Sequence, residues 1–120
     1  LACLLVAEMI AARQKSLREQ LQDLFRRVGR EYWPVRVNLP LSDDAHKKLL
    51  DRLKADPKEF AGQPVTNVNR LDGLKLGFED GSWVLMRPSG TEPVVRIYTE
   101  TASMAASKKL AVDAQAWITK

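Results

Sequence analysis

The chain has 120 residues, of which 45% are hydrophobic and 28% charged, and it carries a net charge of +4 at neutral pH. This balance is typical of one globular domain with a little additional chain, and it argues against a disordered segment or an integral membrane protein. The 19 lysines and arginines are scattered, without the basic clusters that nucleic-acid-binding proteins carry. We therefore expect neither nucleic acid nor a membrane among its partners.

The single cysteine and the single histidine limit the chemistry of the chain. Cys3 cannot form an internal disulfide, so nothing indicates secretion, and we expect a cytoplasmic protein. Its apolar neighbours predict a buried thiol rather than a nucleophile. With His46 as the only histidine and no carboxylates at ligand spacing, no metal site is predicted.

Two helices are predicted before residue 30. Residues 1–12 are apolar on nearly all sides, which is typical of a helix that packs against a neighbouring domain. Ser16 and Glu19 form a capping-box pattern at the start of the second helix, and Gly29 is a typical residue at the end of one. The second helix carries one apolar stripe at helical spacing, formed by Leu17, Leu21, Leu24, Phe25 and Val28. We therefore predict a helical segment over residues 1–29 and a separate domain over residues 30–120.

The predicted second domain begins with a strand and a helix. Residues 32–39 are rich in β-branched and aromatic residues, and Pro34 favours either an edge position or the start of a strand. Ser42 is a suitable N-cap for a helix that ends by Pro57. Residues 58–64 contain a glycine and a proline and are predicted to be a loop.

Four strand signals and a final helix complete the chain. The strands are predicted over residues 65–71, 74–78, 82–87 and 94–100. Asp72-Gly73 and Asp80-Gly81 are strong hairpin turns, which explains both aspartates without any chemistry. Ser103 begins the last helix, whose buried stripe is predicted to be Ala106, Leu110, Ala114 and Trp117. The predicted class is α+β: an antiparallel sheet of four to five strands with two helices on one face, preceded by the N-terminal helical segment.

The most informative segment is Arg87-Pro88-Ser89-Gly90-Thr91-Glu92-Pro93, which joins the last two predicted strands. Arg87 can present a forked pair of N–H donors to an anion, and Ser89 and Thr91 each offer a hydroxyl. Gly90 can adopt a φ closed to other residues and so turn backbone N–H groups inward. A second arginine, Arg96, follows in the next strand. These are the groups that a phosphate monoester needs.

The string Trp83-Val84-Leu85-Met86, followed by this segment and by Val94-Val95-Arg96-Ile97-Tyr98, closely resembles the C-terminal domain of the α-D-phosphohexomutases. That family includes phosphoglucomutase, phosphomannomutase and the phosphoglucosamine mutases. The resemblance implies a TATA-box-binding-protein-like fold for residues 30–120, and it implies that residues 1–29 close the preceding, third domain. It also implies that the loop binds the substrate phosphate that is not reacting, through Arg87, Ser89, Gly90 and Thr91, with Arg96 beside them.

For the intact protein, the resemblance implies an isomerase that interconverts hexose 1-phosphate and hexose 6-phosphate through a bisphosphate intermediate. Its partners would be the phosphorylated hexose and the other domains of the parent enzyme, and magnesium would be its cofactor. The family's phosphoserine loop, magnesium loop and sugar-binding loop do not occur in these 120 residues. We therefore expect no catalytic residue and no cofactor in this chain, and no activity from it alone.

A non-enzymatic RNA-binding module is the alternative. Such modules can use a basic antiparallel sheet whose aromatic side chains stack on bases, and Phe78, Trp83 and Tyr98 are the candidates here. The alternating pattern of these strands is equally typical of a core that helices cover.

Overall fold

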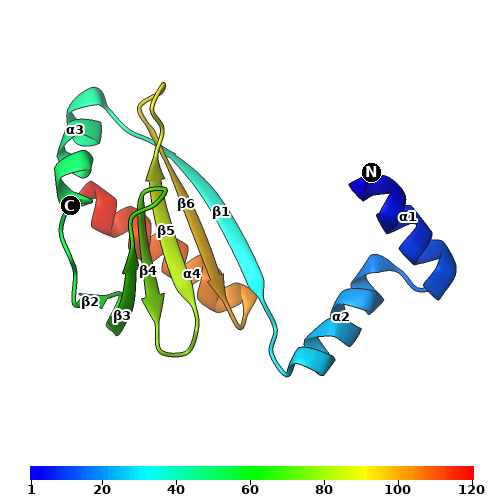
Figure 1. Ribbon diagram of the computed structural model, residues 1–120. Helices are drawn as coiled ribbons and strands as arrows, with labels where there is room; N and C mark the ends of the chain where they lie inside the picture. Colours follow the sequence, from blue (N-terminus) through cyan, green and yellow to red (C-terminus); the bar gives the residue numbers. More distant parts are fainter. The chain divides into compact units, whose positions relative to one another are not determined.

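The computed structural model describes all 120 residues, which form two compact units, Leu1–Glu31 and Tyr32–Lys120 (Figure 1). The first unit is helical, and the second consists of a sheet with two helices. No helix in either unit has the length and apolar character needed to span a bilayer.

The first unit contains α1 (Ala2–Arg13) and α2 (Leu17–Val28). The predicted capping box is present, because the Ser16 hydroxyl accepts from the N–H of Glu19 and the Glu19 carboxylate accepts from the N–H of Ser16. The hydrogen bonds from the side chain and backbone of Ser16 hold the pKa of the Glu19 carboxyl below its ordinary value. Gly29 ends α2 with a left-handed φ of 75°. The prediction of a buried Cys3 is wrong, since α1 buries none of its residues and this thiol is exposed.

The second unit is built on an antiparallel sheet of six strands in the order β1-β6-β5-β4-β3-β2. The strands are β1 (Trp33–Pro40), β2 (Glu59–Phe60), β3 (Gln63–Asn69), β4 (Leu74–Phe78), β5 (Trp83–Pro88) and β6 (Val94–Thr101). The two Asp-Gly turns join antiparallel neighbours, and β1 with its Pro34 is an edge strand, as predicted. The α+β class is confirmed, with six strands in place of the predicted four to five.

Two helices and one face of the sheet enclose the core. They are α3 (Asp43–Arg52), capped by Ser42, and α4 (Met104–Thr119), capped by Ser103. The strands contribute Leu74, Leu76, Phe78, Val84, Met86, Val95 and Ile97 to one buried cluster, and the helical segments contribute Leu49, Leu53, Leu110, Ala114 and Ile118 to the same cluster. Both helices therefore pack against the same face of the sheet, and Figure 1 shows α4 running along it. The other face carries no helix.

The predicted loop over residues 58–64 is in fact a tight hairpin. Glu59–Phe60 pairs with the start of β3, and Ala61 and Gly62 form the turn with positive φ values of 52° and 76°. Phe60 is only 3% exposed, and its ring lies 5.9 Å from that of Trp117. Burial of one large ring thus organises a segment whose composition is typical of a loop.

Helix α3 ends at Arg52, well before Pro57. The carbonyls that follow its last turn accept hydrogen bonds from the guanidinium of Arg70, which contacts Leu53 and, at 2.7 Å, Ala55. Arg70, which directly follows β3, therefore satisfies carbonyl groups at the end of the helix that have no partner within it.

The buried stripe of α4 is shifted from the predicted one. Ala106 is exposed, and the neighbouring Ser107 is fully buried instead. The Ser107 hydroxyl bonds the carbonyl of Trp33 and lies 2.9 Å from the hydroxyl of Thr101. A polar network between α4, β1 and β6 thus sets the rotation of the helix, which an apolar pattern alone does not reveal.

Candidate anion-binding site

Arg87 and Arg96 lie side by side on the face of the sheet that no helix covers. Arg87, near the end of β5, is paired in register with Arg96, near the start of β6. Their chain neighbours Met86 and Ile97 point the other way and are fully buried. The alternation of the strands therefore fixes both arginine side chains on one face. Directly opposed like charges repel each other, so this pair gains from a bound anion.

Asp72 contacts Arg87 from the neighbouring turn. Its Oδ1 lies 2.9 Å from Nε of Arg87, and both side chains are about half exposed. This contact corrects the view that Asp72 serves only the hairpin. The contact follows from the register of β4 and β5, in which Leu74 pairs with Met86, so that the turn before Leu74 lies beside Arg87.

Residues 89–93 connect β5 to β6, and backbone hydrogen bonds hold the base of this loop. The N–H of Ser89 donates to the Val94 carbonyl at 2.8 Å, and the N–H of Leu41 donates to the Pro93 carbonyl at 2.8 Å. The loop is therefore fastened to β6 on one side and to the end of β1 on the other. In Figure 1 it projects beyond the end of the sheet.

Gly90 and Thr91, two neighbouring residues of this loop, differ from what the motif suggests in different ways. Gly90 does not use the left-handed φ that its sequence position suggested, since the glycines with positive φ are Gly29, Gly62, Gly73 and Gly81. The loop turns without such a residue, and a Cβ at Gly90 would meet no atom within 4 Å. Thr91 is exposed, and its N–H makes only a long contact of 3.5 Å with the hydroxyl oxygen of Ser89.

The arrangement offers donors for the oxygens of one anion. The guanidinium groups of Arg87 and Arg96 share a face, and Ser89 and Thr91 follow in the loop that joins their strands. Ser89 is 8% exposed, whereas both arginines are partly accessible. The chain holds no group of three or more His, Cys, Asp or Glu side chains that could bind a metal ion.

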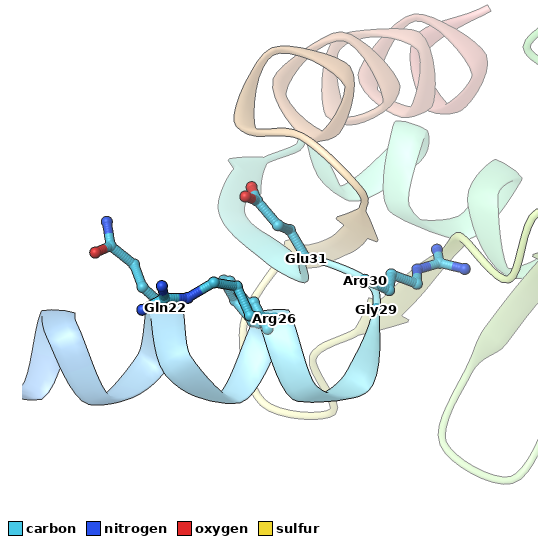
Figure 2. Close-up of a pocket in the computed structure, with 6 residues that line it drawn as sticks. Gln22, Arg26, Gly29, Arg30 and Glu31 are labelled. Carbon is cyan, nitrogen blue, oxygen red and sulfur yellow. The ribbon is translucent and has the colours of Figure 1, made fainter.

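A hollow of about 530 Å³ lies at the end of α2 and is lined only by residues of the first unit (Figure 2). It also contains arginines, but Figure 2 shows Arg26 extending back along the helix toward Gln22 and Arg30 pointing away from it beyond Gly29. These two cations point in different directions, whereas Arg87 and Arg96 are register partners on one face of the sheet. We therefore place the candidate site at the loop.

The aromatic residues of the alternative reading divide between the two faces. Phe78 is buried on the helix side of the sheet. Trp83 and Tyr98 are partly exposed on the opposite side, where Lys75 lies 4.0 Å from the centre of the Trp83 ring and Arg36 lies 5.6 Å from that of Tyr98. Each exposed ring is thus already in contact with a cation from the chain itself.

Comparison with known proteins places the chain in a family. Residues 35–116 match the family model for the phosphoglucomutase/phosphomannomutase C-terminal domain. The chain is 35% identical over 100 residues to a probable phosphoglucosamine mutase of Methanothermobacter thermautotrophicus. The matched region covers 83% of this chain and 21% of that protein. It is also 34% identical over 117 residues to a phosphoglucomutase of Komagataeibacter xylinus, and this match covers 88% of the chain and 20% of that protein.

Among solved structures, a phosphoglucomutase/phosphomannomutase family protein from Burkholderia thailandensis matches with a TM-score of 0.48 and 35% identity, over 68% of this chain and 16% of that one. The chain belongs to the phosphoglucomutase/phosphomannomutase family and carries its C-terminal domain. It spans about a fifth of the length of the curated relatives that it matches. These relatives are mutases, which are isomerases of carbohydrate metabolism.

Proposed function

We propose that this chain is the substrate-phosphate-binding domain of a phosphohexomutase, which interconverts hexose 1-phosphate and hexose 6-phosphate through a bisphosphorylated sugar. The observation that carries the proposal is the register pair of Arg87 and Arg96 beside the loop at residues 89–93. Two guanidinium groups on one face, next to two hydroxyl-bearing residues, suit the oxygens of a phosphate monoester.

The proposed role is to hold the phosphate that is not reacting. In such a reaction the bisphosphorylated sugar must turn over between two transfers, so a phosphate stands at the same place in both orientations. A site that binds this phosphate lends its binding energy to orienting the reacting end of the sugar. Arg87 would provide the forked pair of donors, Ser89 and Thr91 their hydroxyls, and Arg96 a second cation. Gly90 would provide a backbone N–H and the open space around it.

The chemistry itself would belong to other parts of the parent enzyme, acting in the cytoplasm. Residues 1–29 would close the domain that precedes this one, since α1 exposes an almost continuous apolar surface. Magnesium and the phosphorylated serine would lie in domains outside these residues, and the partners would be the hexose phosphate and those domains.

The chain alone is expected to have no mutase activity, because it contributes a binding loop and no phosphorylated nucleophile. A coupled assay with glucose 1-phosphate, its bisphosphate activator and magnesium should stay at background. Turnover by a chromatographically pure sample, at a rate proportional to its concentration, would contradict this division of labour.

Arg87→Lys is expected to weaken the binding of glucose 6-phosphate about tenfold, although the charge is kept. An ammonium group cannot form the forked pair, so about one charge-assisted hydrogen bond is lost, and ~1.4 kcal/mol corresponds to a tenfold change in Kd. The unmodified chain should bind in the millimolar range, near ~4 kcal/mol. Ser89→Ala removes one neutral donor and should weaken binding less, by about threefold. Amide chemical shifts followed during a titration measure all three constants.

The matched control is Arg36→Lys, which makes the same change on the same face of the sheet but in β1, where Arg36 lies over Tyr98. It should leave the Kd unchanged, and the shifts in the unmodified chain should be confined to residues 87–96. Shifts spread over the lysine-bearing helices and insensitive to Arg87→Lys would show unspecific attraction of anions and would rule out the proposed site.

A further inference from the structure

The turn at Asp72-Gly73, between β3 and β4, lies against the strand that carries Arg87. The Asp72 carboxylate approaches Nε of Arg87 at 2.9 Å. Neither terminal nitrogen of the Arg87 guanidinium donates a hydrogen bond within the chain. Asp72 thus occupies the inner side of the group and leaves the outer fork open.

The position of Asp72 is set by the backbone of the turn rather than by the ion pair alone. Gly73 has a φ of 117°, and a Cβ there would lie 2.5 Å from the carbonyl oxygen of Met86 and 3.0 Å from Cα of Arg87. The first of these distances is shorter than real Cβ contacts and the second is unusually tight, so glycine is what lets the turn lie this close to β5. The residue before it is consequently held beside the Arg87 side chain.

The charges around Arg87 make such a support necessary. Arg96 is its register partner, and two opposed guanidinium groups tend to drive each other apart. Asp72 supplies an acidic group that contacts one of the two arginines, Arg87. An exposed ion pair of this kind adds little to the stability of the fold, so its effect should be on orientation.

We propose that Asp72 is a positioning residue for Arg87: it holds the guanidinium through Nε so that the terminal nitrogens face the phosphate. This inference rests on the proposed phosphate site and deepens it. It makes an unusual prediction, because removing a negative charge near an anion site would, by charge alone, strengthen binding. If orientation dominates, removing the Asp72 charge weakens binding instead.

The test is Asp72→Asn in the 120-residue chain, with inorganic phosphate as the ligand at constant ionic strength. Asn-Gly is as suitable a turn as Asp-Gly, so the hairpin is kept while the charge is lost. We expect the Kd for phosphate to rise about fivefold, on the order of one partly lost charge-assisted hydrogen bond. The Nε–Hε resonance of Arg87 should shift and exchange faster with water even without ligand, which a merely structural role would not cause.

Asp80→Asn is the matched control, since it makes the same change in the other Asp-Gly turn, where Asp80 accepts hydrogen bonds from the N–H and the hydroxyl of Ser82. It should leave both the Kd and the Arg87 resonance unchanged. If Asp72→Asn binds phosphate equally well or more tightly while Arg87→Lys still weakens binding, the phosphate site stands and the positioning role is overturned. If phosphate causes no shift at Arg87 in the unmodified chain, the proposed function fails, and this inference fails with it.

Discussion

Replacing Phe60 with alanine is expected to lower the free energy of unfolding of the second unit by about 3–5 kcal/mol, the usual cost of removing a buried phenylalanine ring. Phe60 is 3% exposed and packs at a ring distance of 5.9 Å from Trp117 near the end of α4. Arg52, at the end of α3, also contacts Trp117, with its guanidinium carbon 5.4 Å from the centre of the ring. The loss therefore opens a cavity where β2, α3 and α4 meet.

Urea denaturation followed by tryptophan fluorescence measures this effect. Glu59→Ala is the control, because Glu59 is the exposed neighbour in the same two-residue strand. It should change the unfolding free energy by less than about 0.5 kcal/mol. A loss below about 1 kcal/mol for Phe60→Ala would mean that residues 58–64 are a peripheral loop, as their composition suggested.

Replacing Gly73 with alanine is expected to cost about 2–4 kcal/mol, through two separable effects. The first is the φ of 117°, which L-residues rarely adopt. The second is the approach of the new Cβ to the backbone of β5, at 2.5 Å from the Met86 carbonyl oxygen. The atoms that the new Cβ would meet belong to the backbone of Met86 and Arg87 and not to a flexible side chain, so the hairpin itself must shift.

Two other glycines separate these effects in the same denaturation experiment. Gly62 also has a positive φ, of 76°, but a Cβ there would meet nothing within 4 Å, so Gly62→Ala should show the conformational cost alone, about 1 kcal/mol. Gly90→Ala has neither problem and should lie within about 0.5 kcal/mol of the unmodified chain. Equal losses for Gly73→Ala and Gly62→Ala would show that the close approach to β5 carries no cost.

Local signals in the sequence were sufficient for most of the fold. Ser16, Ser42 and Ser103 each accept the predicted capping hydrogen bond. The two Asp-Gly pairs and the strict alternation in β4 indicate the two hairpins, because Asp-Gly is a strong turn signal and a half-buried strand must alternate. These features depend on neighbouring residues only, which is why a single sequence reveals them. The register of each hairpin differs by one residue from that of a two-residue turn, as the pairing of Leu74 with Met86 shows.

The features that the sequence did not reveal depend on distant residues. The strand at Glu59–Phe60 has only two residues, too few for any periodic pattern, and it exists because Phe60 reaches Trp117. The end of α3 depends on Arg70, and the rotation of α4 depends on a hydroxyl that bonds the carbonyl of Trp33. Propensity and pattern cannot report such tertiary hydrogen bonds.

For the site, the motif indicated the right residue types but not their arrangement. Counting outward from the turns does not give this arrangement, because a two-residue turn at Asp80-Gly81 would pair Arg87 with Leu74. The structure pairs Leu74 with Met86 and Arg87 with Arg96 instead. Gly90 is able to adopt a left-handed φ but does not use one, because a glycine in a turn motif permits that conformation whether or not the turn needs it.

The hydrogen bond from Leu41 to Pro93 has a consequence for what counts as the smallest working piece of this domain. It joins the loop to a strand more than fifty positions earlier in the chain, and β1 pairs with β6 along its whole length. A synthetic peptide of residues 83–98 would contain every motif residue and yet lack the strand that fastens the loop and borders Arg96 at Asn38. The sequence motif that identifies the family is therefore shorter than the part of the chain that holds the loop in its conformation. We expect that the motif cannot be grafted onto another protein as a linear segment.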